Sequence, residues 1–251
     1  MDDGSPDDTQ AVAQRFIEAH GLAGGCERQP NGKIAAARNN ALARARGELV
    51  AFLDHDDLWT PDKLAGCVAE FDKDPSVGLV HHPCRIVDSD GKRLGLTRNG
   101  PWHPDMYGHL LFTQNCLCPS SVVVRAKFVK EVGGFRADPR FDTCEDYDLW
   151  MRLAKVCRFK FIDPALGDYL MASGGASKRA RYHHDNQEAL LLDHFAAWPE
   201  PDAGTRVLMR RRLGRVYRAA ARAMMNNGDW ADAREYAGKL LRAYPLDARN
   251  L

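Results

Sequence analysis

The chain of 251 residues carries 35 Lys and Arg against 34 Asp and Glu, which gives a formal net charge of +1. This balance argues against nucleic acid as a partner, because neutralising phosphates needs a concentrated basic face. The length suits one large domain with a small appendage, and 45% hydrophobic residues can fill a sizeable core. No apolar stretch approaches the ~20 residues that cross a bilayer, and seven cysteines without a regular framework favour a reducing compartment. We therefore expect a cytoplasmic protein.

The predicted elements alternate between helices and strands. The chain opens on an acidic turn at residues 2–8 and continues into a helix with apolar residues at helical spacing. Residues 49–53 are a continuous apolar run, which is typical of a strand buried on both faces. The other predicted elements are helices over 34–46, 61–73, 127–132 and 145–156, strands over 77–81, 121–125 and 159–162, and a hairpin over 86–96. This order predicts an α/β fold with a mostly parallel, doubly wound sheet.

The C-terminal part of the sequence predicts helices only. Residues 206–226 and 230–243 form an antiparallel pair that resembles one tetratricopeptide-type hairpin. A single hairpin of this kind cannot bury its own apolar face, so it should pack on the main domain or on a partner. We expect a main domain over residues 1–175 and a helical extension over residues 176–251. Through the helices of this extension we expect peripheral contact with a membrane or another protein.

Three acids directly follow the predicted strand at residues 49–53, namely Asp54, Asp56 and Asp57. In an open α/β sheet, ligands bind beyond the carboxyl ends of the strands. Packed carboxylates repel one another, and a hard cation such as Mg²⁺ or Mn²⁺ removes that repulsion and can also hold diphosphate oxygens. The alternative is an acidic turn that caps the next helix, which would explain Asp57 but not all of these residues.

Two further acidic segments are candidates for the site. Glu145 and Asp146 begin a predicted amphipathic helix, where a carboxylate can act as a helix cap or as a general base. Asp3 lies in the opening turn and could accept hydrogen bonds from a base or a ribose, although Asp-Gly-Ser is also common turn chemistry.

Together these segments resemble the inverting glycosyltransferases of family 2, which have the GT-A fold. The matching segments are DDGS at residues 2–5, NG and ARN at 31–32 and 37–39, FLDHDDLW at 52–59, GGF at 133–135 and EDYDLWMRL at 145–153. The resemblance implies a Rossmann-like nucleotide-diphospho-sugar transferase fold. It also implies transfer of a sugar, with inversion, from a UDP-linked donor to a hydroxyl of a glycan or other acceptor in cell-surface polysaccharide synthesis.

The resemblance also implies roles for individual residues. Asp3 would bind the nucleotide base, and Arg38 would lie near it. Asp54 and Asp56 would be the outer members of the family's D-x-D motif and would bind the donor. A Mn²⁺ or Mg²⁺ ion would sit on Asp56 or Asp57. Asp146 would be the catalytic base that deprotonates the acceptor hydroxyl.

The sequence departs from the family pattern in two places. The family's first strand and helix are absent, so we expect a truncated sheet and a natural start about 35–40 residues earlier, the length of the missing β-α unit. The Q-x-x-R-W segment of processive synthases is also absent, which favours a single addition. The missing strand leaves an alternative open, in which the chain is a catalytically incomplete fragment that acts as a binding or interaction protein. A nucleotidyltransferase would need a Gly-rich phosphate loop with Arg or Lys after the first strand, and that region is missing.

Several smaller candidates stay open. Trp102, His103 and Tyr107 either stack on an acceptor sugar or pack within the protein. His183 and His184 either contact the diphosphate or are ordinary surface residues, and Ser177 lies in the same region, where relatives have a loop that closes over the ligands.

Overall fold

The structure is a computed structural model that describes residues 1–97, 100, 102–171, 180–198 and 200–244. The expected boundary between the two parts at residue 175 and the candidate Ser177 lie outside the described residues.

The main sheet is mixed. It has the strand order β1-β6-β3-β7, with β3 and β7 parallel and β6 antiparallel to both β1 and β3. Three of its strands therefore run in one direction, and β6 runs in the other. The strands are β1 (Leu49–Ala51), β3 (Val77–His81), β6 (Val122–Arg125) and β7 (Arg158–Phe161). All five residues of β3 are buried, and the α/β class expected from the sequence is confirmed.

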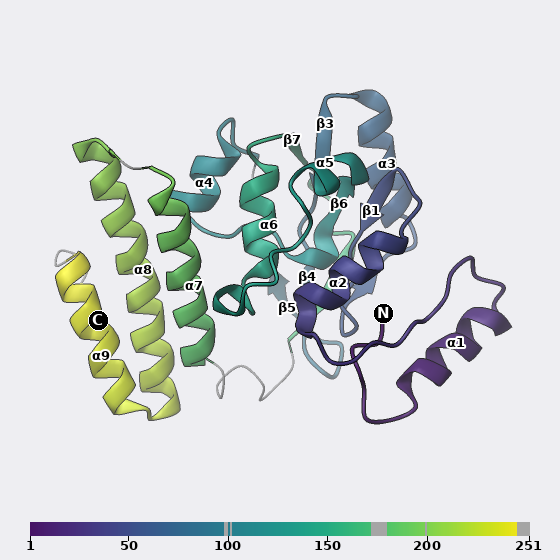
Figure 1. The fold of residues 1–251 in the computed structure, drawn as a ribbon, viewed down its shortest axis with the longest axis horizontal. Coiled ribbons are helices and arrows are strands. Elements are labelled where there is room, and N and C mark those ends of the chain that lie inside the picture. Colours follow the sequence, from purple (N-terminus) through teal and green to yellow (C-terminus); the bar gives the residue numbers. More distant parts are fainter. Residues whose placement is uncertain (98–99, 101, 172–179, 199, 245–251) are drawn as a thin grey trace.

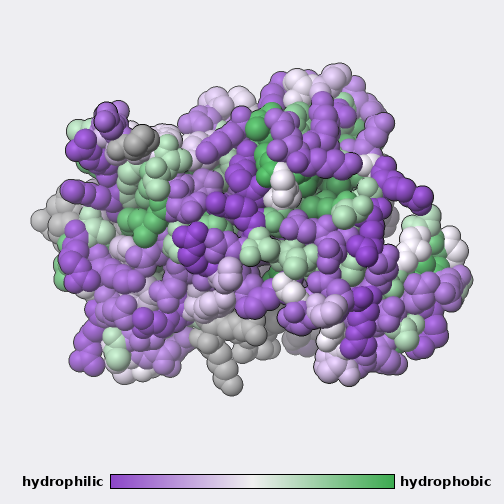
Figure 2. Space-filling view, in the orientation of Figure 1, coloured by the Kyte–Doolittle hydropathy of each residue, from purple (hydrophilic) through white to green (hydrophobic). Residues whose placement is uncertain are grey.

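The expectation for β1 is wrong in one respect. Each of its three residues is half-buried, and Leu53 just beyond it is 49% exposed, whereas the apolar run predicted burial on both faces. The reason is its position, because β1 is an edge strand of the described sheet and pairs there with β6 alone. Figure 2 shows apolar surface around α2, β1 and α5.

A second sheet flanks the end of β1. Its order is β2-β8-β4-β5, and the expected hairpin is present with Gly91 in the left-handed conformation at its turn. The strands are β2 (Leu58–Trp59), β4 (Arg85–Val87), β5 (Arg93–Leu96) and β8 (Gly167–Leu170). Strand β2 begins directly after the acidic run and pairs with β8, so the second sheet fixes the C-terminal side of that run.

The helices of the main domain agree closely with the predicted ones. They are α1 (Thr9–Ala19), α2 (Lys33–Arg44), α3 (Lys63–Lys73), α4 (Met106–Phe112), α5 (Ala126–Glu131) and α6 (Glu145–Leu153). Helix α4 was not predicted, and a short 3-10 helix, η1 (Pro119–Ser121), precedes β6. Helix α6 lies in the core, with seven of its nine residues buried. Helix α1 is the opposite case, because it buries no residue and stands away from the sheets (Figure 1).

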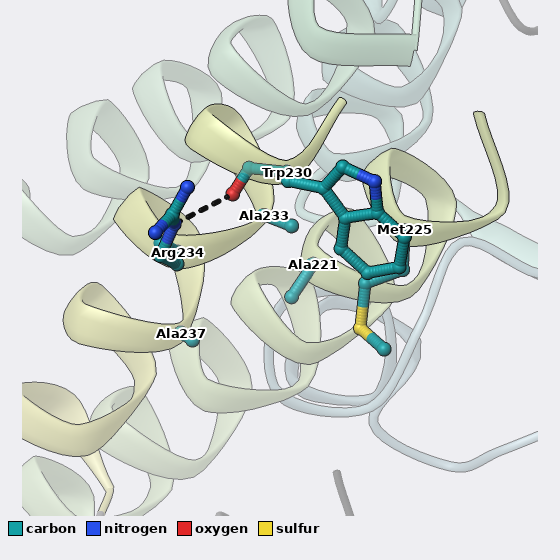
Figure 3. Close-up of a pocket in the computed structure, with 6 residues that line it drawn as sticks. All are labelled: Ala221, Met225, Trp230, Ala233, Arg234 and Ala237. Carbon is teal, nitrogen blue, oxygen red and sulfur yellow. Dashed lines mark hydrogen bonds between the residues drawn. The ribbon is translucent and has the colours of Figure 1, made fainter. Parts of the chain in front are cut away.

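The C-terminal part is a bundle of α7 (Ala180–Ala196), α8 (Ala203–Asn227) and α9 (Trp230–Ala243) on one side of the main domain (Figure 1). The predicted antiparallel pair of α8 and α9 is present, with Gly228 in the left-handed conformation between them. Between the same two helices lies an apolar pocket of about 500 Å³ beside Met225 and Trp230 (Figure 3). Arg215 of α8 donates to the carbonyl of Phe112, so the bundle contacts the main domain. No helix within the described ranges is long and apolar enough to cross a membrane.

Candidate active site

Arg38 joins the acidic run after β1 to the first turn of α6. Its Nη2 lies 2.6 Å from Oδ1 of Asp54, and its Nη1 lies 2.8 Å from Oε1 of Glu145. The side chain of Arg38 is 17% exposed and stacks over the ring of Phe135. A guanidinium presents several donors in a fixed plane, so it can hold two carboxylates at once. Two of the predicted segments therefore meet at one place.

The acidic run has a fixed backbone. The amide of Asp54 donates to Oγ of Ser120 at 3.0 Å, and the amide of Asp57 donates to the carbonyl of Asp54 at 3.1 Å. The Asp57 side chain is buried and accepts a 3.1 Å hydrogen bond from the amide of Leu170 in β8. Burial raises the pKa of Asp57, and a hydrogen bond with Ser120 partly offsets this. Asp57 thus connects the run to the second sheet.

Asp56 has different surroundings. It is exposed, and no hydrogen bond or ion pair holds it among the described residues. Carboxylate oxygens are the ligands that Mg²⁺ and Mn²⁺ prefer, and Mg²⁺ commonly takes one or two carboxylates together with substrate phosphates and water. Within the described part of the chain, no group of three or more His, Cys, Asp or Glu side chains could hold a metal. The exposed carboxylate of Asp56 could supply one ligand to such a cation, and the remaining ligands would have to come from a bound diphosphate and water.

The two acids that begin α6 differ in exposure, because Glu145 is buried and Asp146 is half-buried. Burial raises the pKa of Asp146, the charge of Arg38 opposes this and the charge of Asp54 adds to it, so that the pKa lies at about 6. The pKa of Glu145 is also raised, by burial and by the charge of Asp146, with Arg38 again opposing. Oε2 of Glu145 is buried without a hydrogen-bond partner among the described residues. A carboxylate with a raised pKa is a stronger base than one in water, which is what proton abstraction near neutral pH requires.

Asp3 lies in a turn that the structure builds around it. Its Oδ1 accepts hydrogen bonds from Nε2 of Gln29 at 2.7 Å and from the amide of Gly32 at 2.8 Å. The adjacent Gly4 has a left-handed conformation and approaches the backbone of Asn31, so a side chain there would be strained. Asp3 therefore holds the opening turn against the start of α2.

A second group of side chains gathers around Asp142 and Thr143, which precede α6 in the chain. Oδ2 of Asp142 accepts from Nζ of Lys33 at 2.6 Å and from the hydroxyl of Tyr182 at 2.9 Å. Lys33 has a left-handed backbone with φ of 68°, which is uncommon for a residue other than glycine. In the same region Nδ1 of His183 lies 3.0 Å from Oγ1 of Thr143. Of this group, only His183 was predicted from the sequence. The Asn-Gly pair before Lys33 is typical of a turn and could have indicated the unusual backbone of Lys33.

Ser120 is the second feature that the sequence reading missed. Its carbonyl accepts from Nζ of Lys63 at 2.6 Å and from Nε1 of Trp59 at 2.9 Å. Lys63 is fully buried and lies 4.0 Å from the centre of the Trp59 ring. Burial lowers the pKa of Lys63 to about 8. Ser120 thus contacts the acidic run through its hydroxyl, which binds the amide of Asp54, and its carbonyl binds Lys63.

Two of the three candidates for acceptor stacking contact neighbouring side chains of the protein. The ring of His103 stacks on that of His109, and Tyr107 is half-buried between Lys155 and His194. Both side chains therefore take part in packing, while Trp102 is 48% exposed.

A buried ion network fixes α6 from its other face. The carboxylate of Asp148 is inaccessible to solvent and binds Arg136, Arg152 and Nε2 of His194. Burial alone would raise the pKa of Asp148, but hydrogen bonds from His194 and Arg136 and the charges of the two arginines lower it to about 2. Because His194 belongs to α7, this network also attaches the C-terminal bundle to the helix that carries Asp146.

Comparisons with known proteins identify the family of this chain. Residues 1–133 match the family described as Glycosyl transferase family 2. A chondroitin synthase of Escherichia coli is 30% identical over 162 residues, which are 64% of this chain and 23% of that enzyme. The chain thus spans less than a quarter of that relative's length.

Two solved structures are similar in fold. TarS of S. aureus in complex with UDP-GlcNAc has a TM-score of 0.57 at 17% identity, over 99% of this chain and 80% of that one. The mannosyltransferase PcManGT from Pyrobaculum calidifontis, in complex with GDP-Man and Mn²⁺, has a TM-score of 0.57 at 21% identity, over 99% of this chain and 66% of that one. At these identities the likeness concerns the fold alone, and it confirms the expected GT-A architecture.

Proposed function

This chain belongs to glycosyl transferase family 2, and we propose that it transfers a sugar from a UDP-linked donor to a hydroxyl of a glycan acceptor, with inversion at the anomeric carbon. The observation that carries this proposal is the Arg38 bridge. It brings Asp54, which follows β1, within hydrogen-bond distance of the same guanidinium as Glu145, the neighbour of Asp146. A donor site and a base are therefore adjacent, as a direct displacement requires.

The choice of donor and pathway draws on the relatives. The E. coli relative is a chondroitin synthase, and one of the solved structures of similar fold holds UDP-GlcNAc. We extend both facts to this chain as a proposal, and place its reaction in polysaccharide synthesis. The seven cysteines form no regular framework in the sequence, which supports a reducing compartment such as the cytoplasm.

In the proposed reaction the acceptor hydroxyl attacks the anomeric carbon of the donor. Asp146 takes the proton from the acceptor oxygen as the new carbon–oxygen bond forms. The bond between the anomeric carbon and the diphosphate oxygen breaks in the same step, so the configuration inverts. The raised pKa of Asp146 supports this role, because a base is most effective when its pKa lies near the working pH.

The acidic run would hold the leaving group. Asp56 is the carboxylate that would ligate Mn²⁺ or Mg²⁺, because it is exposed while Asp57 is buried against Leu170. When bound, the cation supplies charge neutralisation for the departing nucleoside diphosphate. Asp54 would orient the donor together with Arg38, and Asp3 would position the base through the turn that it stabilises.

The proposal is tested by titrating the full chain with UDP in the presence and absence of Mn²⁺ by calorimetry. We expect binding that depends on Mn²⁺ and is lost in Asp56→Ala. Asp72→Ala is the matched control, because Asp72 is an exposed acid of α3. Product analysis by NMR with a panel of UDP-sugars and glycan acceptors then reports the anomeric configuration.

Two results would contradict the proposal. Absence of UDP binding under all conditions would favour the alternative of an interaction protein without catalysis. Retention of the donor's configuration in the product would exclude the single displacement by an acceptor activated at Asp146.

A further inference from the structure

Two cysteines meet beneath the acidic run. Sγ of Cys84 lies 3.9 Å from Sγ of Cys118, although the two residues are 34 positions apart in the chain. Cys84 lies between β3 and β4 and is buried, whereas Cys118 precedes η1 and is half-buried.

We propose that Cys84 and Cys118 are a modification site, in which a reversible disulfide regulates the donor site. Bond formation needs the two sulfur atoms to approach from 3.9 Å to about 2.0 Å. Such a movement is small enough for a loop shift. The regulatory part of the proposal rests on the proposed function, and the disulfide itself does not.

The oxidant is a low-molecular-weight disulfide such as glutathione disulfide. The thiolate of Cys118, the more exposed partner, attacks one sulfur of the oxidant and expels a glutathione thiolate, which leaves a mixed disulfide. Cys84 then loses its proton and attacks Sγ of Cys118, and the second glutathione thiolate leaves. Two protein thiols are oxidised to one disulfide, and one molecule of glutathione disulfide is reduced to two thiols.

The surroundings suit this order of events. Cys84 is buried and Cys118 is half-buried, so Cys118 is the thiol that an oxidant in solution can reach first. The Lys63 ammonium lies close enough to interact with both sulfur atoms, and a nearby cation favours the thiolate form.

A disulfide at Cys118 would act on the acidic run through Ser120. The amide and hydroxyl of Ser121 both donate to the carbonyl of Cys118, which ties Cys118 to η1. Oγ of Ser120 accepts from the amide of Asp54, and its carbonyl accepts from Lys63. Drawing Cys118 toward Cys84 displaces these acceptors, so the oxidised protein should bind the nucleotide more weakly.

The test begins with the disulfide. The reduced full chain is equilibrated with glutathione disulfide, alkylated, digested with trypsin and examined by mass spectrometry. We expect a link between peptides 74–85 and 99–125. The second peptide contains both Cys116 and Cys118, so the link should be lost in Cys118→Ser and kept in Cys116→Ser. Fragmentation of the linked peptide locates the bridge even if the buried Cys116→Ser variant fails to fold. Absence of a Cys84–Cys118 link overturns the proposal.

The second part measures regulation. We expect UDP, in the presence of Mn²⁺, to bind the oxidised protein at least about fivefold more weakly than the reduced one, which is at the lower end of typical coupling between sites. Dithiothreitol should restore the affinity, and Cys118→Ser should not respond to the oxidant. Equal affinity of the linked and reduced proteins overturns the regulation.

If neither form binds UDP, the proposed function fails. Hydrogen exchange then tests independently whether the disulfide alters the acidic run. The amide of Asp54 should then exchange faster in the linked protein, because its acceptor is Ser120. Unchanged exchange at Asp54 in the linked protein overturns the regulation without reference to UDP.

Discussion

Arg38 and Glu145 are 107 positions apart in the chain, yet Nη1 of Arg38 lies 2.8 Å from Oε1 of Glu145. The second guanidinium nitrogen binds Asp54. Helix α2 therefore connects the end of β1 to the start of α6, and the charge of one arginine partly balances three acids, since Asp146 also interacts with it. We therefore expect Arg38 to contribute more to the stability of this site than any other residue of α2.

The first prediction concerns stability. Arg38→Ala leaves two partly buried carboxylates without a cation, so we expect the free energy of unfolding to fall by about 3 kcal/mol. Arg44→Ala is the control on the same helix, because Arg44 pairs with Glu27 at the surface. An exposed pair should cost roughly 0.5 kcal/mol. Urea denaturation followed by circular dichroism measures both free energies of unfolding. Equal losses in the two variants would show that the Arg38 bridge stabilises the fold no more than an exposed ion pair does.

The second prediction concerns the base. We expect Asp146→Asn to lower kcat by about 10³-fold, with UDP affinity unchanged, because general base catalysis contributes about 10²–10⁴-fold. The rate should also rise with pH through about 6, because Asp146 must lose its proton before it can accept another. Initial rates of UDP release from pH 4 to 9 provide the profile.

Glu145→Gln distinguishes the two neighbouring acids. It removes the charge of Glu145 but keeps its shape. We expect the rate of transfer to fall by no more than about tenfold, which is a much smaller loss than removal of the base should cause. The opposite result, with Glu145→Gln nearly inactive and Asp146→Asn active, would assign the base to Glu145.

The sequence was informative where local pattern decides structure. Strand β3 and helix α9 have the predicted bounds, 77–81 and 230–243, because a buried apolar run and a helical period determine them. It was less informative where distant partners decide. The two-residue strand β2 exists through its pairing with β8, and α4 was hidden in an irregular stretch rich in aromatic and polar residues.

The candidate site shows the same division. The sequence identified Asp54 and Asp146 as acids at the ends of elements, and the family match covers Asp54 but ends at residue 133, before Asp146. It could not indicate that Arg38 would bind both acidic segments, because the bridge depends on how α2 packs. The sequence also could not distinguish Asp56 from Asp57 as the metal ligand. In the structure Asp57 is buried and binds the amide of Leu170 in β8, whereas Asp56 is exposed.

The third prediction concerns the network beneath α6. Asp148→Ala removes the common partner of Arg136, Arg152 and His194, and breaking a buried charge network of this kind costs about 3–5 kcal/mol. Asp193→Ala is the matched control, because Asp193 also binds Arg136 but its side chain is 29% exposed. Asp193→Ala should cost about 1 kcal/mol or less.

The same network predicts how stability depends on pH. The pKa of Asp148 is about 2 in the folded protein, below the ordinary value of 3.8. Asp148 therefore stabilises the fold fully above pH 3.8, and this contribution of roughly 2 kcal/mol is lost as the pH falls toward 2. Denaturation of Asp148→Ala should show a smaller loss over that interval, and an identical loss in both proteins would contradict the prediction.

The fourth prediction separates Asp56 from Asp57. Asp57→Ala leaves the amide of Leu170 without its acceptor, so we expect a loss of about 1–3 kcal/mol in the free energy of unfolding. Asp56→Ala removes an exposed side chain and should change stability by less than about 0.5 kcal/mol.

For binding, the expected order is reversed. Asp56→Ala should abolish the effect of Mn²⁺ on UDP affinity, because Asp56 is the exposed carboxylate of the run, whereas Asp57→Ala should keep that effect. Each variant thus serves as the control for the other in paired denaturation and calorimetry experiments. If Asp57→Ala lost the Mn²⁺ effect while Asp56→Ala kept it, the cation would have to sit on Asp57, and the hydrogen bond from Leu170 would then orient a ligand rather than only tie β8 to the acidic run.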